Sequence, residues 1–162
     1  MGGFSMAKYD ELCKLYRAAA SRFREYESSC YTFINAFFAG LSDFLQSPKA
    51  AIQFHQVTDP LDMETALPLL NAINYSPDGF YEVVFSITIQ FGDASDRVLA
   101  AARFRKMENQ FVIRVGMSRK EFQIDEPKDQ IQVYAYIFEA IKKYYQKDGF
   151  IKNLPDPIGF TI

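Results

Sequence analysis

The sequence has no tryptophan, a single histidine and only two cysteines among its 162 residues. Hydrolase triads and most catalytic metal sites are built around histidine, so His55 alone leaves little room for either. The sequence also lacks a glycine-rich phosphate loop, a Cys-x-x-Cys pair and a Gly-x-Ser-x-Gly elbow. These absences favour a non-catalytic protein, and they predict no metal and no cofactor.

Neither sign of charge dominates, since the sequence has 18 lysines and arginines and 20 aspartates and glutamates. A nucleic-acid-binding protein usually carries a clustered basic excess, so we expect no nucleic-acid partner. No apolar run approaches the roughly 20 residues of a membrane span, so we expect no membrane contact either. The chain opens without the basic and apolar regions of a signal peptide, which predicts a cytoplasmic location.

Aromatic residues are abundant, with 16 Phe and 10 Tyr, and many of them follow a helical pattern. Apolar residues recur at 3-4 spacing along the first third of the chain, and no proline occurs before Pro48. The positions are Leu12, Tyr16, Ala19, Phe23, Tyr26, Cys30, Phe33, Phe37 and Phe44, with Gly40 as the one bare position. The spacing predicts a long helix over residues 5–46 or a tight helical pair, with a bend near Ser28-Ser29 or Gly40 left open.

A continuous helix over residues 5–46 would be roughly 60 Å long. A compact globule of this size is only about 40 Å across, so the helix must kink, fold back or project towards a partner. Charged residues flank the apolar positions up to Glu27, whereas no charge occurs from Ser28 to Ser42. We therefore expect the second half to lie in the core and the first half to project. Cys13 and Cys30 would then be about 25 Å apart, which excludes an intrachain disulfide.

The remainder of the chain predicts strands and one further helix. Residues 51–124 indicate mainly an antiparallel sheet. Its strands would be one over 51–57, an alternating strand over 81–91, two further strands and an edge strand over 121–124. A short helix would run from Asp59-Pro60 towards Ile73. Pro127, capped by Asp125, opens a helix over 127–147, and an extended tail follows over 150–162. The predicted fold is a single α+β domain over 1–162. In it, an antiparallel β-meander of about four to five strands is packed by a long N-terminal and a C-terminal helix.

Two sets of residues are candidate ligand sites. The first is an apolar cavity between the sheet and the helices, to which His55 and tyrosine hydroxyls would supply polar contacts. Its lining residues would be Tyr81, Phe85, Ile89, Phe104, Ile113 and His55. The same aromatic residues can equally well fill a core. The second set is Arg103, Arg105 and Arg114, which share the opposite sheet face and could hold an anion or pair across strands with Glu82.

The sequence thus favours a small protein-interaction module that forms a homodimer, or binds another protein, through its N-terminal helix. The alternative is a small-molecule-binding protein or pocket enzyme that takes an apolar or anionic ligand.

Overall fold

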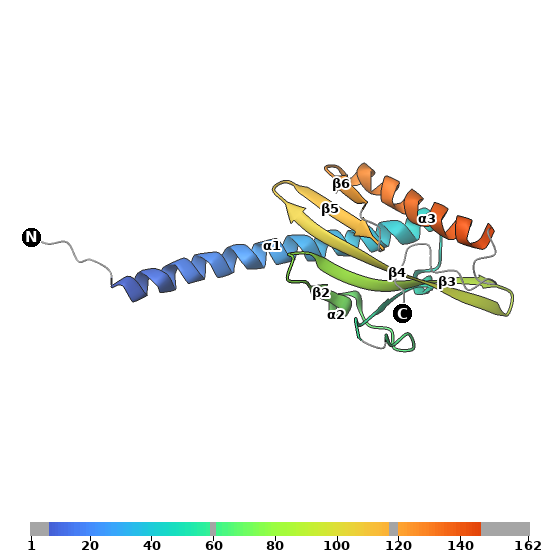
Figure 1. Cartoon of the computed structure of the whole chain (residues 1–162), viewed down its shortest axis with the longest axis horizontal. Helices are drawn as coiled ribbons and strands as arrows, with labels where there is room; N and C mark the ends of the chain where they lie inside the picture. The colour runs from blue at the N-terminus through green and yellow to red at the C-terminus, as the bar shows by residue number, and fades with distance from the viewer. Residues whose placement is uncertain (1–6, 59–60, 117–119, 147–162) are drawn as a thin grey trace, which may run out of the picture.

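A computed structural model describes residues 7–58, 61–116 and 120–146. The elements in chain order are α1 (Lys8–Leu45), η1 (Lys49–Ala51), β1 (Ile52–His55), α2 (Leu69–Ala72), β2 (Ile73–Tyr75), β3 (Tyr81–Phe91), β4 (Ala94–Met107), β5 (Gln110–Val115), β6 (Glu121–Ile124), η2 (Pro127–Asp129) and α3 (Gln130–Gln146). Figure 1 shows α1 and α3 side by side against a curved sheet, with the first half of α1 extending well beyond the strands.

The sheet has six antiparallel strands in the order β1-β3-β4-β5-β6, and β2 also pairs with β3. β1 and β2 share one edge of β3, because β1 pairs with Val84–Ile87 and β2 with Tyr81–Val83. The predicted α+β class, with a long N-terminal helix, an antiparallel sheet and a C-terminal helix, is confirmed. The tail predicted over 150–162 lies outside the described residues.

An aromatic row on one face of the sheet forms the floor of the core. The register places Phe104 opposite both Tyr81 and Ile113, and these residues are fully buried. Phe37 of α1 lies on this row, with its ring centroid 5.1 Å from that of Phe104. The period-2 alternation of β3 and β4 thus provides the surface on which both helices pack.

Gly40, the bare position of the apolar pattern, marks the crossing of α1 and α3. A Cβ atom on Gly40 would lie about 3.0 Å from Cζ of Tyr134 and closer still to its hydroxyl oxygen. Only glycine allows the tyrosine ring to pack this closely on the α1 backbone. The Tyr134 hydroxyl then donates a hydrogen bond of 2.8 Å to the carbonyl of Phe37. α1 is one continuous helix through this point and through Ser28-Ser29, and neither position is a bend.

Of the short helix expected from Asp59-Pro60 towards Ile73, with Pro68 dividing it into two short turns, only Leu69–Ala72 is helical among the described residues. The Asp62 carboxylate accepts hydrogen bonds from the backbone N–H groups of Glu64 and Thr65, which stabilises a turn instead. Pro68 then limits where a helix can begin. The residues after α2 form β2, a strand that the sequence pattern did not predict.

Three smaller boundaries also differ from expectation. β1 covers Ile52–His55 rather than residues 51–57, and β4 begins at Ala94, directly after a turn at Gly92-Asp93. The cap before the last helical segment is Glu126, not Asp125, because Glu126 and Asp129 form a capping box. That segment begins as the short helix η2 and continues as α3.

Two buried tyrosines differ in their hydrogen bonds and provide a matched test of the core. The Tyr81 hydroxyl has no hydrogen-bond partner among the described residues, whereas Tyr134 donates to Phe37. A buried polar group without a partner costs about 1–3 kcal/mol. We expect Tyr81→Phe to leave the free energy of unfolding unchanged or raise it by about 1 kcal/mol, and Tyr134→Phe to lower it by a similar amount. Urea denaturation of both variants measures this, and equal losses would contradict it.

Candidate functional site

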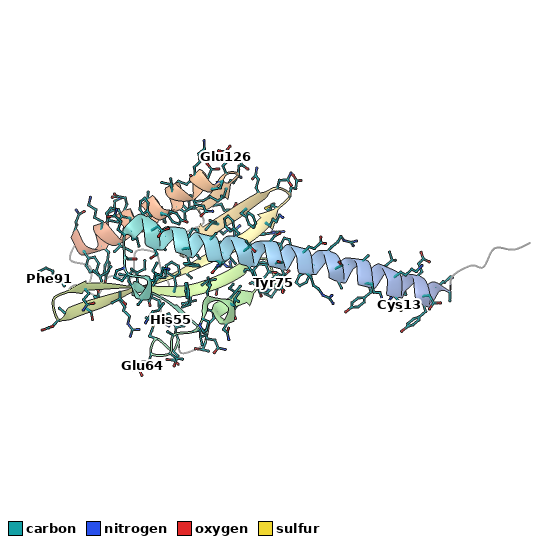
Figure 2. The ribbon with its side chains drawn as sticks, turned by 180° about the vertical axis from the view of Figure 1, so that it is seen from behind. Cys13, His55, Glu64, Tyr75, Phe91 and Glu126 are labelled. Carbon is teal, nitrogen blue, oxygen red and sulfur yellow. The ribbon has the colours of Figure 1, made fainter. Side chains whose placement is uncertain are left out.

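The first half of α1 leaves its large apolar side chains in solvent. Burial along the helix begins at Cys30. Before that point, Leu12 is 63% and Tyr16 74% exposed, although both belong to the apolar pattern. Figure 2 shows this half, with Cys13 near its far end, lying clear of the strands. The expectation that the second half is core and the first half projects is confirmed for the described residues.

The exposed residues continue the core face of the same helix. Residues 18 positions apart lie on the same side of a straight α-helix, because 18 residues make about five turns. The pairs related in this way are Leu12 and Cys30, Leu15 and Phe33, Tyr16 and Ile34, Ala19 and Phe37, and Phe23 and Leu41. The second member of every pair belongs to the core or packs against it. We call Leu12, Leu15, Tyr16, Ala19 and Phe23 the outer stripe.

Charge is kept off the outer stripe. Asp10, Lys14 and Arg17 lie roughly on the opposite side of the helix, and Glu11 lies beside the edge of the stripe, as 3.6 residues per turn requires. The projecting half is therefore strongly amphipathic, although only Phe23 at its inner end packs against a strand. Such segregation is typical of a helix whose apolar side packs against another surface.

The outer stripe ends where the sheet begins. The Phe23 ring packs edge-on against Tyr75 of β2, with centroids 5.9 Å apart. Three residues further on, the Tyr26 ring lies 6.2 Å from that of Tyr81 and its hydroxyl reaches the backbone of Lys106. Phe23 and Tyr26 thus mark the boundary between the free and the covered parts of one helix face.

Both cysteines are free, Cys30 in the core and Cys13 half-buried on the projecting half. They lie on one continuous helix, so the prediction that they form no intrachain disulfide is confirmed. Burial is the main cause that raises the pKa of the Cys30 thiol. Cys30 is therefore a protonated, unreactive core residue at neutral pH.

The structure brings together only four of the six residues that were predicted to line an apolar cavity. Tyr81, Phe85, Phe104 and Ile113 come together, fully buried under the helices. Ile89 lies further along β3 and is 39% exposed. His55 lies on the other face of the sheet, because its neighbour Phe54 packs on Phe38 of α1.

His55 belongs to a buried polar pair that the sequence did not reveal. Its Nε2 atom lies 2.8 Å from Oγ of Ser86, and its Nδ1 atom lies 3.4 Å from the carbonyl oxygen of Thr65. His55 and Ser86 are both fully buried. Through the contact to Thr65, the pair holds the 61–67 segment over the second sheet face. Arg97 fastens the same segment by donating to the carbonyl of Met63 at 2.7 Å.

The three predicted arginines come together around one ring, that of Phe80. The Cζ atoms of Arg103, Arg105 and Arg114 lie 5.5, 5.7 and 4.6 Å from its centroid. The sequence pattern did not indicate Phe80, whose ring is almost fully buried beneath them.

Carboxylates neutralise most of this arginine cluster. Arg103 pairs with Asp78 at 3.1 Å and Glu82 at 3.3 Å, and Arg114 pairs with Glu121. Within the part of the chain that the structure describes, only Arg105 of the three has no ion pair to a carboxylate. The capacity of this face to hold an anion therefore depends mainly on Arg105.

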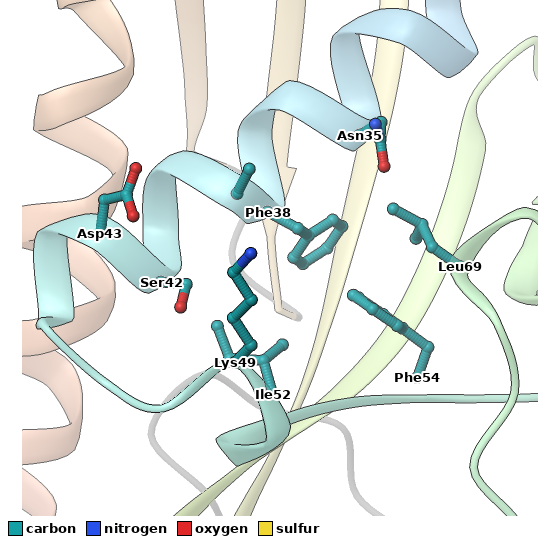
Figure 3. A pocket seen from close by; sticks show the side chains of 9 residues that line it. Asn35, Phe38, Ser42, Asp43, Lys49, Ile52, Phe54 and Leu69 are labelled. Carbon is teal, nitrogen blue, oxygen red and sulfur yellow. The ribbon is translucent and has the colours of Figure 1, made fainter.

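A hollow of about 360 Å³ opens at the sheet edge between α1, η1, β1 and α2. Figure 3 shows the rings of Phe38 and Phe54 on its floor, with Leu69 beside them and Lys49 reaching across from η1. Its remaining lining includes Asn35, Ala39, Ser42, Asp43 and Ile52. The hollow combines an apolar floor with a polar rim, and it lies away from the predicted cavity residues.

The described residues hold no cluster of metal-ligating side chains, and none of their helices is long and apolar enough to cross a bilayer. Comparison of the chain with protein-family models, curated proteins and solved structures gives no match.

Burial of His55 gives a testable pH dependence. Burial lowers the pKa of His55 below its ordinary value of about 6.5, so the unfolded chain binds a proton more readily than the folded chain. We expect the free energy of unfolding to fall as the pH drops through about 6.5, by up to about 1.4 kcal/mol per pH unit. Denaturation between pH 7.5 and 5.5 measures this, with His55→Gln as the variant that lacks the titrating group. Identical pH dependence in both proteins would contradict the assignment.

Proposed function

We propose that this protein is a non-catalytic protein-interaction module that self-associates through the outer stripe of α1. The observation that carries the proposal is the continuation of the core face of α1 through the outer stripe, of which only Phe23 packs against the sheet. A contiguous row of exposed leucine and aromatic side chains is unusual on a monomer and is typical of an interaction surface.

A second copy of the same helix is the occupant that this surface favours. The stripe is long and narrow, about 16 Å from Leu12 to Phe23, which suits a helix better than a compact ligand. It alternates large and small side chains, since Tyr16 precedes Ala19 by one turn, so that one copy can interlock with another. The charged side, which carries Asp10, Lys14 and Arg17, remains in solvent when the stripes meet.

The energy available is sufficient for a stable dimer. Complete burial of one leucine or aromatic side chain contributes about 1.5–3 kcal/mol. Leu12, Leu15, Tyr16 and Phe23 are all exposed, and a symmetric pair buries each of them twice. Part of that gain is lost to the translational and rotational entropy of association and to the ordering of side chains.

A charge placed on the stripe should separate the copies without unfolding the domain. We expect Leu12→Asp to weaken self-association by roughly 100-fold or more, because two leucines are lost from each dimer and two carboxylates are buried in their place. Native mass spectrometry across a dilution series measures this against the 18.6 kDa chain mass. The matched control is Ser21→Asp, which puts the same charge on the solvent side of the helix.

Thermal unfolding of the monomeric variant completes the test. Leu12 makes no contact with the sheet, so the variant should keep the folded domain. A wild-type chain that is monomeric at every concentration, or a Leu12→Asp variant that stays as dimeric as Ser21→Asp, would contradict the proposal.

The hollow beside Lys49 supports a second candidate function, the binding of a small amphiphilic ligand. Phe38, Phe54 and Leu69 offer an apolar floor, and Lys49 offers a cation at the rim. This combination suits a small aromatic or aliphatic carboxylate.

A small aromatic acid such as phenylacetate is the probe for this second function. We expect it to raise the melting temperature of the wild-type chain and to have no effect on Ala39→Phe, in which the new ring occupies the hollow. The control Lys49→Gln keeps the floor and should bind the acid several-fold more weakly. An unchanged melting temperature of the wild-type chain at millimolar phenylacetate would contradict this candidate.

A further inference from the structure

We infer that a second hollow, on the other flank of α1 from the hollow beside Lys49, binds a small aromatic phosphate monoester through Lys106. This hollow has a volume of about 640 Å³ and lies between α1, the β4–β5 hairpin and the beginning of the last helical segment. Its size is that of an ordinary small-molecule site. It includes no residue of the outer stripe, so the inference is independent of the proposed self-association.

Lys106 interrupts the apolar row on the core face of β4. Side chains alternate along a strand, so Lys106 follows Ala102 and Phe104 on the face that the helices cover. Ala102 and Phe104 are fully buried, whereas Lys106 is half-buried at the rim of the sheet. Its ammonium group lies 3.5 Å from Oγ of Ser29 and 5.9 Å from the ring centre of Phe111, its cross-strand partner. The alternation thus places a cation where it would otherwise place an apolar side chain.

The charge of Lys106 is available to a ligand. Among the residues that the structure describes, no carboxylate forms an ion pair with Lys106. Lys106 is also the one charged side chain among the described residues that line the hollow. The hollow therefore favours an anion, and the half-buried position of the ammonium group makes that attraction stronger than it would be in open solvent.

Two stacked rings form the apolar wall of the hollow. The rings of Phe33 in α1 and Phe111 in β5 lie nearly parallel, with centroids 3.9 Å apart and an angle of 6° between their planes. Phe33 also packs edge-on against Phe104 of the core, with centroids 6.2 Å apart. Both stacked rings are half-buried, so part of their surface is open to the hollow. A planar aromatic group is the ligand body that packs best on such a wall.

Hydroxyl groups of α1 line the same hollow. Ser28, Ser29 and Thr32 follow one another within little more than one helical turn, and the amide of Gln130 lies in the lining as well. A phosphate monoester carries a charge of roughly −1.5 to −2 and three terminal oxygens, so it accepts hydrogen bonds from several donors at once. Lysine is a common phosphate ligand because its ammonium group is a compact charge with three donors. This set of donors therefore suits a phosphate better than a carboxylate, which has two oxygens.

The uncharged segment of α1 leaves both hollows open. Between Ser28 and Ser42 the exposed residues are Ser28, Thr32, Asn35, Ala36 and Ala39. Three of them line the hollow beside Lys106, and Asn35 and Ala39 line the hollow beside Lys49. A long side chain at these positions would fill the space, and a carboxylate would repel an anion.

An adjoining hollow of about 360 Å³ shares Lys106 and Ser29 with the larger one. Glu25 and Glu108 line it together with Arg22 and Lys106, so two negative charges meet two positive ones. The adjoining hollow therefore offers no net attraction to an anion. Since the stacked rings line only the larger hollow, the aromatic phosphate belongs there.

Titration calorimetry of the full chain with phenyl phosphate tests the site. We expect Ala36→Phe to abolish binding, because the new ring fills the hollow. The matched control Ala39→Phe puts the same ring into the hollow beside Lys49 and should bind as the wild type does. Both residues are exposed, and thermal unfolding followed by circular dichroism checks that both variants remain folded.

Removal of the charge and changes of the ligand complete the test. We expect Lys106→Gln to weaken binding by about 10-fold or more, as the loss of a charge-assisted hydrogen bond does. The control Lys142→Gln removes the same charge from the exposed side of α3 and should leave the affinity unchanged. Inorganic phosphate lacks the ring and benzoate lacks the phosphate, and each should bind at least about 10-fold more weakly than phenyl phosphate.

Binding of phenyl phosphate that is lost in Ala36→Phe and weakened in Lys106→Gln, but kept in both controls, supports the inference. Binding that persists in Ala36→Phe, or that Ala39→Phe abolishes instead, overturns the location. Equal losses in Lys106→Gln and Lys142→Gln show unspecific attraction and overturn it as well. Inorganic phosphate or benzoate binding as tightly as phenyl phosphate overturns the ligand class, and an absence of heat at millimolar phenyl phosphate overturns the site.

Discussion

The packing of two adjacent phenylalanines of α1 on the aromatic row of the sheet is the contact on which the remaining architecture depends. The ring centroid of Phe38 lies 4.9 Å from that of Phe54 in β1 and 5.0 Å from that of Phe85 in β3. The ring centroid of Phe37 lies 5.1 Å from that of Phe104 in β4 and 5.2 Å from that of Tyr134 in α3. Each aromatic pair contributes about 0.5–1.5 kcal/mol beyond the area that it buries. Two neighbouring residues therefore join three strands and the second helix, and they fix both the position and the direction of α1. Gly40 completes this contact by letting Tyr134 approach the helix backbone.

The direction of α1 then determines what its first half can do. A continuous helix of 38 residues is about 57 Å long, and the sheet covers only the part from Tyr26 onward. Because no proline or other interruption lies between the two halves, the projecting half is held at a fixed angle to the domain. Its exposed apolar side chains therefore present an ordered surface rather than a flexible arm. Association through an ordered surface loses less conformational entropy than association through a disordered segment.

The sequence predicted the elements that have strong periodicity and missed those that depend on tertiary contacts. The 3-4 spacing around Phe23 and Phe37 predicted α1 and its projection, and the alternation in β3 predicted the core face of the sheet. The alternation of side chains along β1 could also have predicted the position of His55, because it places Phe54 and His55 on opposite faces of the sheet. The short β2 was missed because the Asp62 turn and Pro68 decide where the chain between β1 and β3 can be helical. The arginine cluster was predicted, but its dependence on the Phe80 ring and on Asp78 follows from a turn geometry that spacing does not reveal.

One helix face here has two environments, and the division between them has a physical cause. The residues of the face are similar along its length: Leu12 and Tyr16 in the free half correspond to Cys30 and Ile34 in the covered half. What differs is only whether a sheet lies opposite, and the sheet ends at Tyr75 and Tyr81. Stability of the domain and burial of the outer stripe are therefore separable, because no core contact involves a residue before Phe23. The same hydrophobic pattern that holds the helix on the sheet leaves an exposed apolar surface beyond the last strand.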